Sequence, residues 1–294
     1  MILTFYGVRG SIPAPGPETV KYGGNTSCIH IRLESGSDLI LDSGTGIRQL
    51  GRHIVNQDRD LFLLLSHRHW DHIQGFPFFL PVYQPGRKIC IYSGAEANDD
   101  LLSILRQMDG ATFPVHARQL PSRVSNVGHD AMVQRLQAKG VNILTRALNH
   151  PGGGQAFRIE EEGVVVAYVT DNELDPPGTI TTRYESWVEF CRGADLLIHD
   201  AQYTESDMPH KHGWGHSLIS QVRRLAVDAE VRNLVMFHHD PERTDFELEQ
   251  VERDNDAYFR GLRAPSRCIV SFEGLSLRIR ASDTDAGRHF LEVL

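Results

Sequence analysis

Four side chains of the types that bind metal ions lie within six positions of one another. They follow the apolar run 61–65 directly and are His67, His69, Asp71 and His72. A short, uninterrupted apolar run is typical of a β-strand that is covered on both faces. Imidazole nitrogens and carboxylate oxygens together suit zinc or a similar divalent first-row ion. The stretch therefore predicts a buried strand that ends in a metal-binding loop.

Three further ligand-type residues follow later strand-like runs. His150 comes just past the extended run 141–145, Asp171 directly follows the run that ends at Thr170, and His238 directly follows the run 234–237. Each one alone would more often cap a turn. Their repetition after separate strands predicts that they converge at one edge of a sheet, where functional residues commonly gather.

The whole chain alternates strand-like and helix-like segments without a repeat or an interdomain linker. This order predicts one α/β (α+β) domain over 1–294, with two sheets packed face to face and helices outside. We expect strands at 3–6, 28–33, 38–42, 61–65, 88–92, 141–145, 155–160, 164–169, 196–199 and 234–237, and a final hairpin of 268–272 with 275–279. We expect helices at 47–55, 95–108, 131–139, 183–191, 217–227 and 246–260.

The composition excludes several classes of protein. The 294 residues are 40% hydrophobic and carry a formal net charge of −8. The chain therefore has no overall positive charge that would attract nucleic acid or an anionic membrane. No run approaches the ~20 apolar residues of a membrane span. The first residues lack the pattern of a secretory signal. Four widely spaced cysteines predict small buried side chains and no disulfide framework. We therefore expect a cytoplasmic protein.

Seven positions agree in type, order and strand-end context with one family. The signature His67-x-His69-x-Asp71-His72, followed by His150, Asp171 and His238, resembles the metallo-β-lactamase superfamily over essentially the whole chain. The resemblance implies a four-layer αββα sandwich with two divalent metal ions, zinc by preference and manganese as the alternative. It implies a first metal on His67, His69 and His150, a second on Asp71, His72 and His238, and Asp171 bridging both. His239 is the alternative to His238, which we prefer because it ends its strand directly.

A further resemblance indicates one branch of this superfamily. The run 196–203, LLIHDAQY, followed by Gly215-His216-Ser217, is similar to tRNA 3′-processing endonucleases and their phosphodiesterase relatives. It implies that His216, oriented by Asp200, is the acid that protonates the leaving group. Asp71 joins these two in the expected catalytic set.

Segments near the start of the chain resemble the cyclic-phosphodiesterase members of this branch. They are GVRGS (7–11), YGGNTS (22–27) and LDSGTG (41–46). Arg9, Ser11, Asn25 and Thr26 are the expected substrate contacts, and Arg9 could meet a phosphate charge. A surface arginine in a tight turn is the equally good alternative for Arg9. The loops 113–122 and 204–215 could add an aromatic wall or a lid, although a solvated loop is the simpler interpretation.

Three functions remain open. The first is hydrolysis of a small cyclic phosphodiester, either a cyclic mononucleotide or a ribosyl cyclic phosphate. The second is endonuclease cleavage of precursor tRNA, and the third is a non-hydrolytic role such as a metal-bound sensor.

Only twenty residues separate His150 from Asp171, which leaves no room for the RNA-gripping arm of the tRNA enzymes. The net charge also disfavours stable binding of a large RNA. The redox relatives replace the second signature histidine with glutamate, so His69 favours hydrolysis. We therefore expect a small phosphodiester substrate and, from the family, a homodimer.

Overall fold

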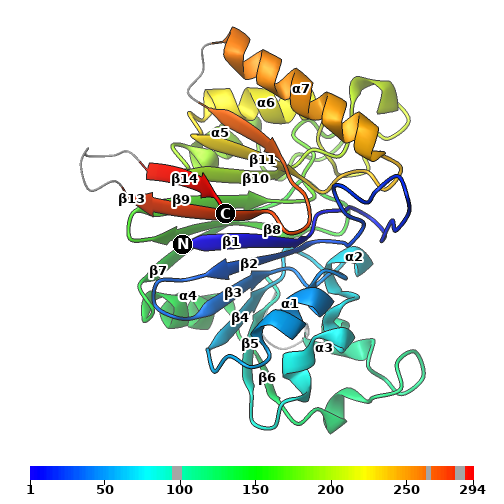
Figure 1. Ribbon diagram of the computed structural model, residues 1–294, viewed down its shortest axis with the longest axis vertical. Coiled ribbons are helices and arrows are strands. Elements are labelled where there is room, and N and C mark those ends of the chain that lie inside the picture. Colours follow the sequence, from blue (N-terminus) through cyan, green and yellow to red (C-terminus); the bar gives the residue numbers. More distant parts are fainter. Residues whose placement is uncertain (95–100, 263–265, 282–288) are drawn as a thin grey trace.

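In the computed structural model, two β-sheets pack face to face and helices cover their outer surfaces (Figure 1). The structure describes residues 1–94, 101–262, 266–281 and 289–294. This arrangement confirms the predicted layers of helices, sheet, sheet and helices. None of the helices in those ranges combines the length and the apolar run that crossing a membrane requires.

Both sheets are mixed. Over the described residues, the first has eight strands in the order β14-β13-β1-β2-β3-β4-β5-β6, and the second has six in the order β12-β11-β10-β9-β8-β7. Strands β3 to β6 are parallel to one another, and so are β9 to β12. The strands are β1 Ile2–Gly7, β2 Cys28–Arg32, β3 Asp38–Leu41, β4 Leu61–Leu64, β5 Lys88–Tyr92, β6 Arg123–Asn126, β7 Val141–Ala147, β8 Gln155–Glu161, β9 Val164–Val169, β10 Leu196–Asp200, β11 Asn233–Phe237, β12 Arg267–Val270, β13 Ser276–Ala281 and β14 His289–Val293.

The helices divide between the two outer faces. The first sheet is covered by α1, α2 and α3, and the second by α5, α6 and α7. Helix α4 packs on β7 and adds Met132 and Leu136 to the core between the sheets. The helices are α1 Ile47–Ile54, α2 Trp70–Ile73, α3 Leu101–Arg106, α4 His129–Gln137, α5 Tyr184–Cys191, α6 Ile219–Asp228 and α7 Asp245–Gly261.

Strand β4 shows why its sequence is apolar without interruption. Phe62 and Leu64 belong to the core between the sheets, whereas Leu61, Leu63 and Leu65 pack under the helices of the first sheet. Alternate side chains of a strand point to opposite faces, so a strand that is buried on both faces has no polar position. The strand covered on both faces is therefore confirmed.

The parallel strands determine where the functional side chains lie. Parallel strands end at the same edge of their sheet, so the residues that follow them gather there. Asp42 follows β3 and the histidine loop follows β4 in the first sheet, while Asp171 and His238 follow β9 and β11 in the second. The loop after β1, in dark blue, and α2 lie at this edge in Figure 1.

The predicted final hairpin is wrong. Strand β12 pairs with β11 in the second sheet, whereas β13 pairs with β1 in the first. Between them the chain crosses from one sheet to the other, and two backbone bonds hold the crossing: Ser271 N donates to Met236 O, and Gly274 N donates to Phe5 O. Two apolar runs joined by a short turn look the same in sequence whether they pair with each other or with different sheets.

Two strands were not expected from the sequence. Strand β6 lies at the edge of the first sheet and is only partly buried, and β14 pairs with β13 at the opposite edge. Edge strands lack the apolar pattern of strands that are buried on both faces. Of the predicted helix 95–108, the residues 95–100 lie outside the described residues, and α3 occupies Leu101–Arg106.

Candidate metal centre

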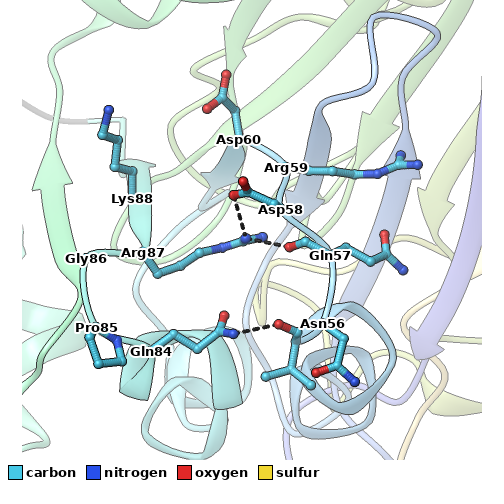
Figure 2. Close-up of a pocket in the computed structure, with 11 residues that line it drawn as sticks. Asn56, Gln57, Asp58, Arg59, Asp60, Gln84, Pro85, Gly86, Arg87 and Lys88 are labelled. Carbon is cyan, nitrogen blue, oxygen red and sulfur yellow. Dashed lines mark hydrogen bonds and ion pairs between the residues drawn. The ribbon is translucent and has the colours of Figure 1, made fainter.

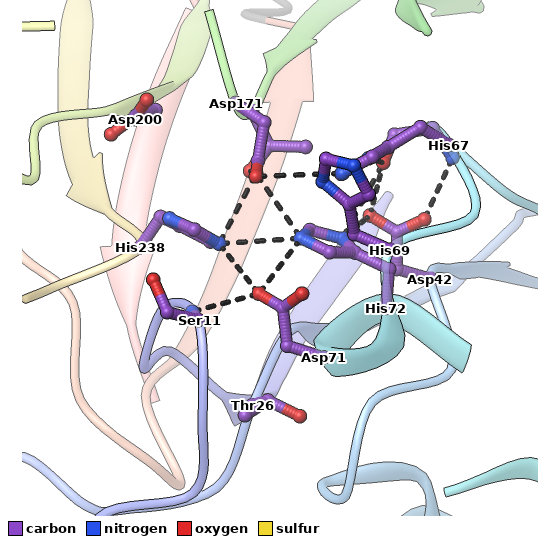
Figure 3. A network of polar contacts seen from close by, with 12 residues as sticks. Ser11, Thr26, Asp42, His67, His69, Asp71, His72, Asp171, Asp200 and His238 are labelled. Atoms are coloured by element: carbon purple, nitrogen blue, oxygen red, sulfur yellow. Dashed lines mark hydrogen bonds and ion pairs between the residues drawn. The ribbon is translucent and has the colours of Figure 1, made fainter. Parts of the chain in front are cut away.

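The histidine loop leads directly into α2, which is only one turn long. His69 is the residue before the helix and is exposed, and Trp70 is exposed as well. Asp71 and His72 are buried and point toward the side chains that the second sheet supplies (Figure 3). The helical turn therefore separates His69 from the pair Asp71 and His72, so that the two groups reach different sides of the centre.

A first cluster of donor atoms forms on the side of His69. The Nε2 atoms of His67 and His150 lie 3.5 and 3.7 Å from Asp171 Oδ2. His69 Nδ1 lies 2.9 Å from His150 Nε2. These four residues can each turn one donor atom toward a common point.

A second cluster forms on the side of α2. The Nε2 atoms of His72 and His238 lie 3.2 Å apart, and each is 3.1 Å from Asp171 Oδ1. Asp71 Oδ2 lies 3.3 Å from His72 Nε2 and 3.1 Å from His238 Nε2. Asp171 thus turns one oxygen to each cluster, which is the arrangement of a carboxylate that bridges two cations.

The donor set fits divalent cations. His72 Nδ1 pairs with Asp42 and His238 Nδ1 pairs with Gln202 Oε1, so each outer nitrogen can carry its ring's proton. The inner Nε2 lone pairs then face carboxylate oxygens. His67 Nε2 is buried and has no hydrogen-bond partner. Two donor atoms on one tetrahedral zinc ion lie about 3.3 Å apart, close to the spacings in both clusters. Converging lone pairs of this kind need cations between them.

Burial and the neighbouring charges shift the pKa values of His72 and Asp171 in opposite directions. Burial would lower the pKa of His72, but Asp171, Asp71 and Asp42 outweigh it and raise the pKa well above its usual value. Burial would raise the pKa of Asp171, but His238 and His72 hold it well below its usual value. Burial lowers the pKa of His150 to about 4, so this ring is neutral, the form that ligates metals.

Asp42 supports the centre from outside and was missed as a functional residue in the sequence. Its Oδ2 lies 2.9 Å from His72 Nδ1 and accepts from Ser66 Oγ at 2.8 Å and Tyr168 Oη at 2.7 Å. Such a partner fixes both the tautomer and the orientation of a ligating imidazole. The signal that could have found it is the one that found the ligands: a carboxylate that directly follows a strand.

Three residues of the centre and its support, each following a strand, adopt a backbone conformation that is rare outside glycine. The φ angles of Asp42, Asp171 and His238 are 59°, 48° and 60°. Such angles are uncommon for residues with a side chain, and they gather at functional sites. At each position the chain turns sharply after its strand, which brings Asp171 and His238 into the clusters and Asp42 against the outer nitrogen of His72.

His216 lies against both clusters. Its Nδ1 is 2.9 Å from Asp200 Oδ2, and its ring lies 5.1 Å from the ring of His238 and 5.3 Å from that of His150. Burial would lower the pKa of His216, but Asp200 outweighs it and raises the pKa to about 9. The predicted partnership of His216 with Asp200 is therefore present in the structure.

His239 lies outside the centre. Its Nε2 is 2.8 Å from Ser271 O, and mainly burial lowers its pKa to about 3. His238, in contrast, faces Asp71 and Asp171. The structure therefore brings His238 and not His239 into the second cluster, as the position at the strand end predicts.

Of the four residues expected to contact the substrate, one touches the donor clusters and the other three bond elsewhere. Only Ser11 touches the clusters, because its backbone N–H donates to Asp71 Oδ2 at 2.8 Å. Arg9 is fully buried, and its guanidinium donates to the carbonyls of Gly23, Asp240 and Arg243. This is neither the expected phosphate contact nor the alternative of a surface arginine, because the guanidinium ties three loop segments together.

Asn25 and Thr26 also bond to protein groups. Asn25 Nδ2 donates to Glu273 Oε2 at 2.8 Å, and Thr26 Oγ1 accepts from Thr45 N at 2.9 Å. A substrate contact from either side chain would compete with these bonds.

Glu173 also shapes the centre and gave no signal in the sequence. Its two carboxylate oxygens accept from Gly213 N at 2.9 Å and Gly215 N at 3.0 Å. Gly215 O in turn lies 3.0 Å from His150 Nδ1. Glu173 therefore positions the loop 204–215 against a residue of the first cluster.

One cavity opens beside the first cluster and another lies away from it. The first, of about 560 Å³, is lined by His67, His69 and the glycine loop 152–154, among others. The second, of about 470 Å³, lies at the opposite ends of β4 and β5 (Figure 2). There Arg87 Nη1 donates to Gln57 O at 2.5 Å and lies 3.7 Å from Asp58. None of the residues that line this second cavity belongs to the metal centre.

Comparisons with known proteins agree with this architecture. Residues 39–239 match the family model described as the beta-lactamase superfamily domain. A curated relative, ribonuclease Z of Haloferax volcanii, is 22% identical over 332 aligned positions that cover 98% of each chain.

Two solved structures share the fold. The metallo-beta-lactamase fold protein YhfI of Bacillus subtilis has a TM-score of 0.66 at 18% identity, with 94% of this chain and 98% of that chain covered. A diphosphatase of the PhnP family has a TM-score of 0.63 at 17% identity, with 95% and 98% covered.

The role of Asp42 can be tested by Asp42→Asn. An amide can still bond to Ser66 but loses the charge that holds the His72 Nδ1 proton, so we expect zinc affinity to fall about 10- to 100-fold. The measurement is a competitive titration with a chromogenic chelator, with circular dichroism to verify the fold. The control is Asp38→Asn, because Asp38 is a buried carboxylate at the other end of β3 that pairs with His30 at 2.8 Å. Unchanged zinc affinity in Asp42→Asn would contradict the assignment.

Proposed function

Because the chain belongs to the metallo-β-lactamase superfamily and is a metal-dependent hydrolase, we propose that it hydrolyses a small cyclic phosphodiester. The substrate class is a cyclic mononucleotide or a ribosyl cyclic phosphate. The observation that carries the proposal is the pairing of two donor clusters, joined by Asp171, with the adjacent dyad of His216 and Asp200.

The donor sets determine which cations would be held. His67, His69 and His150 with Asp171 suit zinc, as do His72, His238 and Asp71 with Asp171, and manganese is the alternative. The chemistry that such ions supply when bound is polarisation of the phosphoryl oxygens and ionisation of a water nucleophile near neutral pH. Asp71, which also accepts the backbone N–H of Ser11, holds the loop after β1 against the second cluster.

His216 is the proposed general acid. Asp200 binds its Nδ1 and thereby stabilises the protonated ring and fixes its orientation. The ring is stacked on His238 and lies edge-to-face against His150, so it borders the space between the two clusters. From there it can donate a proton to the leaving oxygen of a phosphodiester, which otherwise departs as a poor alkoxide leaving group.

Three features favour a small substrate. Only the short hairpin of β8 and β9 lies between His150 and Asp171, where the tRNA enzymes carry their arm. The cavity beside His69, of about 560 Å³, is in the range that binds small molecules. The net charge of −8 also leaves little general attraction for a polyanion.

Cleavage of precursor tRNA is the second candidate. It is favoured by the relative named ribonuclease Z, which aligns with 98% of this chain. That alignment extends over 332 positions, more than the 294 residues of this chain, so the relative has residues without a counterpart here. This difference is why we rank the tRNA substrate second.

A substrate panel tests the ranking. Protein loaded with zinc or manganese is offered cyclic mononucleotides, cyclic dinucleotides, a ribosyl cyclic phosphate and precursor tRNA, and products are followed by chromatography. We expect turnover of a cyclic mononucleotide or the ribosyl cyclic phosphate. Cleavage of precursor tRNA alone would reverse the order of the two candidates.

Two histidine variants separate metal binding from proton transfer. His69→Ala should lose metal and turnover together, because His69 supplies a donor to the first cluster. His216→Ala should keep its metal and lose about 10²- to 10⁴-fold in rate on substrates with poor leaving groups. The loss should be small for a p-nitrophenyl ester, whose leaving group needs no proton.

The control for both variants is His53→Ala, an exposed histidine on α1 that bonds to Tyr6. It should keep both metal and activity. Near-normal activity of His216→Ala on an alkyl ester would refute the general-acid assignment.

A further inference from the structure

Two of the three tryptophans of this chain are exposed, and both lie beside the metal centre. Trp70 is 73% exposed and Trp214 is 60% exposed, whereas Trp187 is fully buried. An exposed indole leaves a large apolar surface in water, which disfavours it unless something covers the ring. Neither position is explained by the packing of the sandwich.

Trp70 is carried by the helical turn that also positions Asp71 and His72. It stands between His69 and Asp71 and is the first residue of α2. The three helix residues that follow it are buried, so α2 turns its other side inward and leaves the indole at the outer rim. The position of the indole is thus fixed by the same turn that positions the donor atoms.

Trp214 is held on the other side of the centre. The residues before and after it, Gly213 and Gly215, donate their backbone N–H groups to Glu173. The proposed general acid His216 comes two residues later. The backbone that carries Trp214 is therefore anchored at both flanks, although its side chain is exposed.

Both tryptophans are next to groups that contact the ring of His150. His150 Nε2 lies 2.9 Å from His69 Nδ1, and His150 Nδ1 lies 3.0 Å from Gly215 O. Trp70 follows His69 and Trp214 precedes Gly215. The two indoles are thus carried by the two segments that meet at opposite nitrogens of one imidazole, at the exposed end of the first cluster.

We propose that Trp70 and Trp214 bind the nucleobase of the substrate by stacking, so that the phosphodiester is a nucleotide and not a base-free sugar phosphate. The inference rests on the proposed function and specifies its substrate class. Indole stacks on any base, because every base has a π face, whereas a ribosyl phosphate offers none. The cavity beside His69 is lined by neither tryptophan, so the stacked base would lie at the mouth of the centre.

Direct binding tests the proposal without relying on turnover. Adenosine monophosphate and ribose 5-phosphate are titrated by calorimetry into zinc-loaded wild type, Trp70→Ala and Trp214→Ala. Each variant should bind adenosine monophosphate about 5- to 150-fold more weakly, the range expected for one base–aromatic stack. Binding of ribose 5-phosphate should not change, and Trp70→Phe should restore most of the nucleotide affinity.

The control is Phe246→Ala, which removes an aromatic side chain of similar exposure, 71%, at the start of α7. It should bind both ligands as wild type does. Zinc content and sedimentation are measured on every variant.

Three outcomes would overturn the proposal: unchanged nucleotide affinity in both alanine variants, an equal loss for ribose 5-phosphate, or a change in oligomeric state that shows a second copy covering the indoles. Failure of the proposed function is distinguishable, because it would show as wild type that turns over none of the small cyclic phosphodiesters in the panel.

Discussion

The structure of the centre depends on one carboxylate, that of Asp171, which contacts both clusters of donor atoms. Asp171 is buried, turns Oδ1 to one cluster and Oδ2 to the other, and has histidines on both sides. Buried charges and lone pairs in such numbers are unfavourable without compensation. The surroundings supply part of it: Asp42 and Gln202 bond to the outer nitrogens of His72 and His238. The remainder must come from cations, so the protein is organised to hold acceptors close together until cations occupy the space between them.

The centre is built by both sheets at once. The first sheet contributes Asp42 and the histidine loop, and the second contributes Asp171 and His238. The hydrogen bond from Tyr168 Oη to Asp42 Oδ2, at 2.7 Å, crosses the core between the sheets. Neither sheet alone carries a complete donor set, so the geometry of the centre is a consequence of how the sandwich packs. The left-handed backbone at the ends of β3, β9 and β11 is part of the same construction.

The sequence predicted the parts of this centre that are local and missed the parts that depend on packing. The spacing of His67, His69, Asp71 and His72 is a property of one loop, and their strand is recognisable because both of its faces are apolar. Glu173 could not be found in this way, because its function lies in two backbone groups about forty residues away. The prediction of a hairpin between β12 and β13 was wrong for a related reason. The packed core, and not the turn between them, determines which sheet each strand joins.

The ring of His150 contacts both the first cluster and the loop 204–215. One nitrogen faces the first cluster and the other meets the carbonyl of Gly215, so the ring joins the donor set to the loop 204–215. Coupling between two sites is reciprocal at equilibrium. A molecule that binds this loop and a cation that binds the first cluster would therefore change each other's affinity by the same factor. The two binding events would thus be coupled through a single imidazole, that of His150.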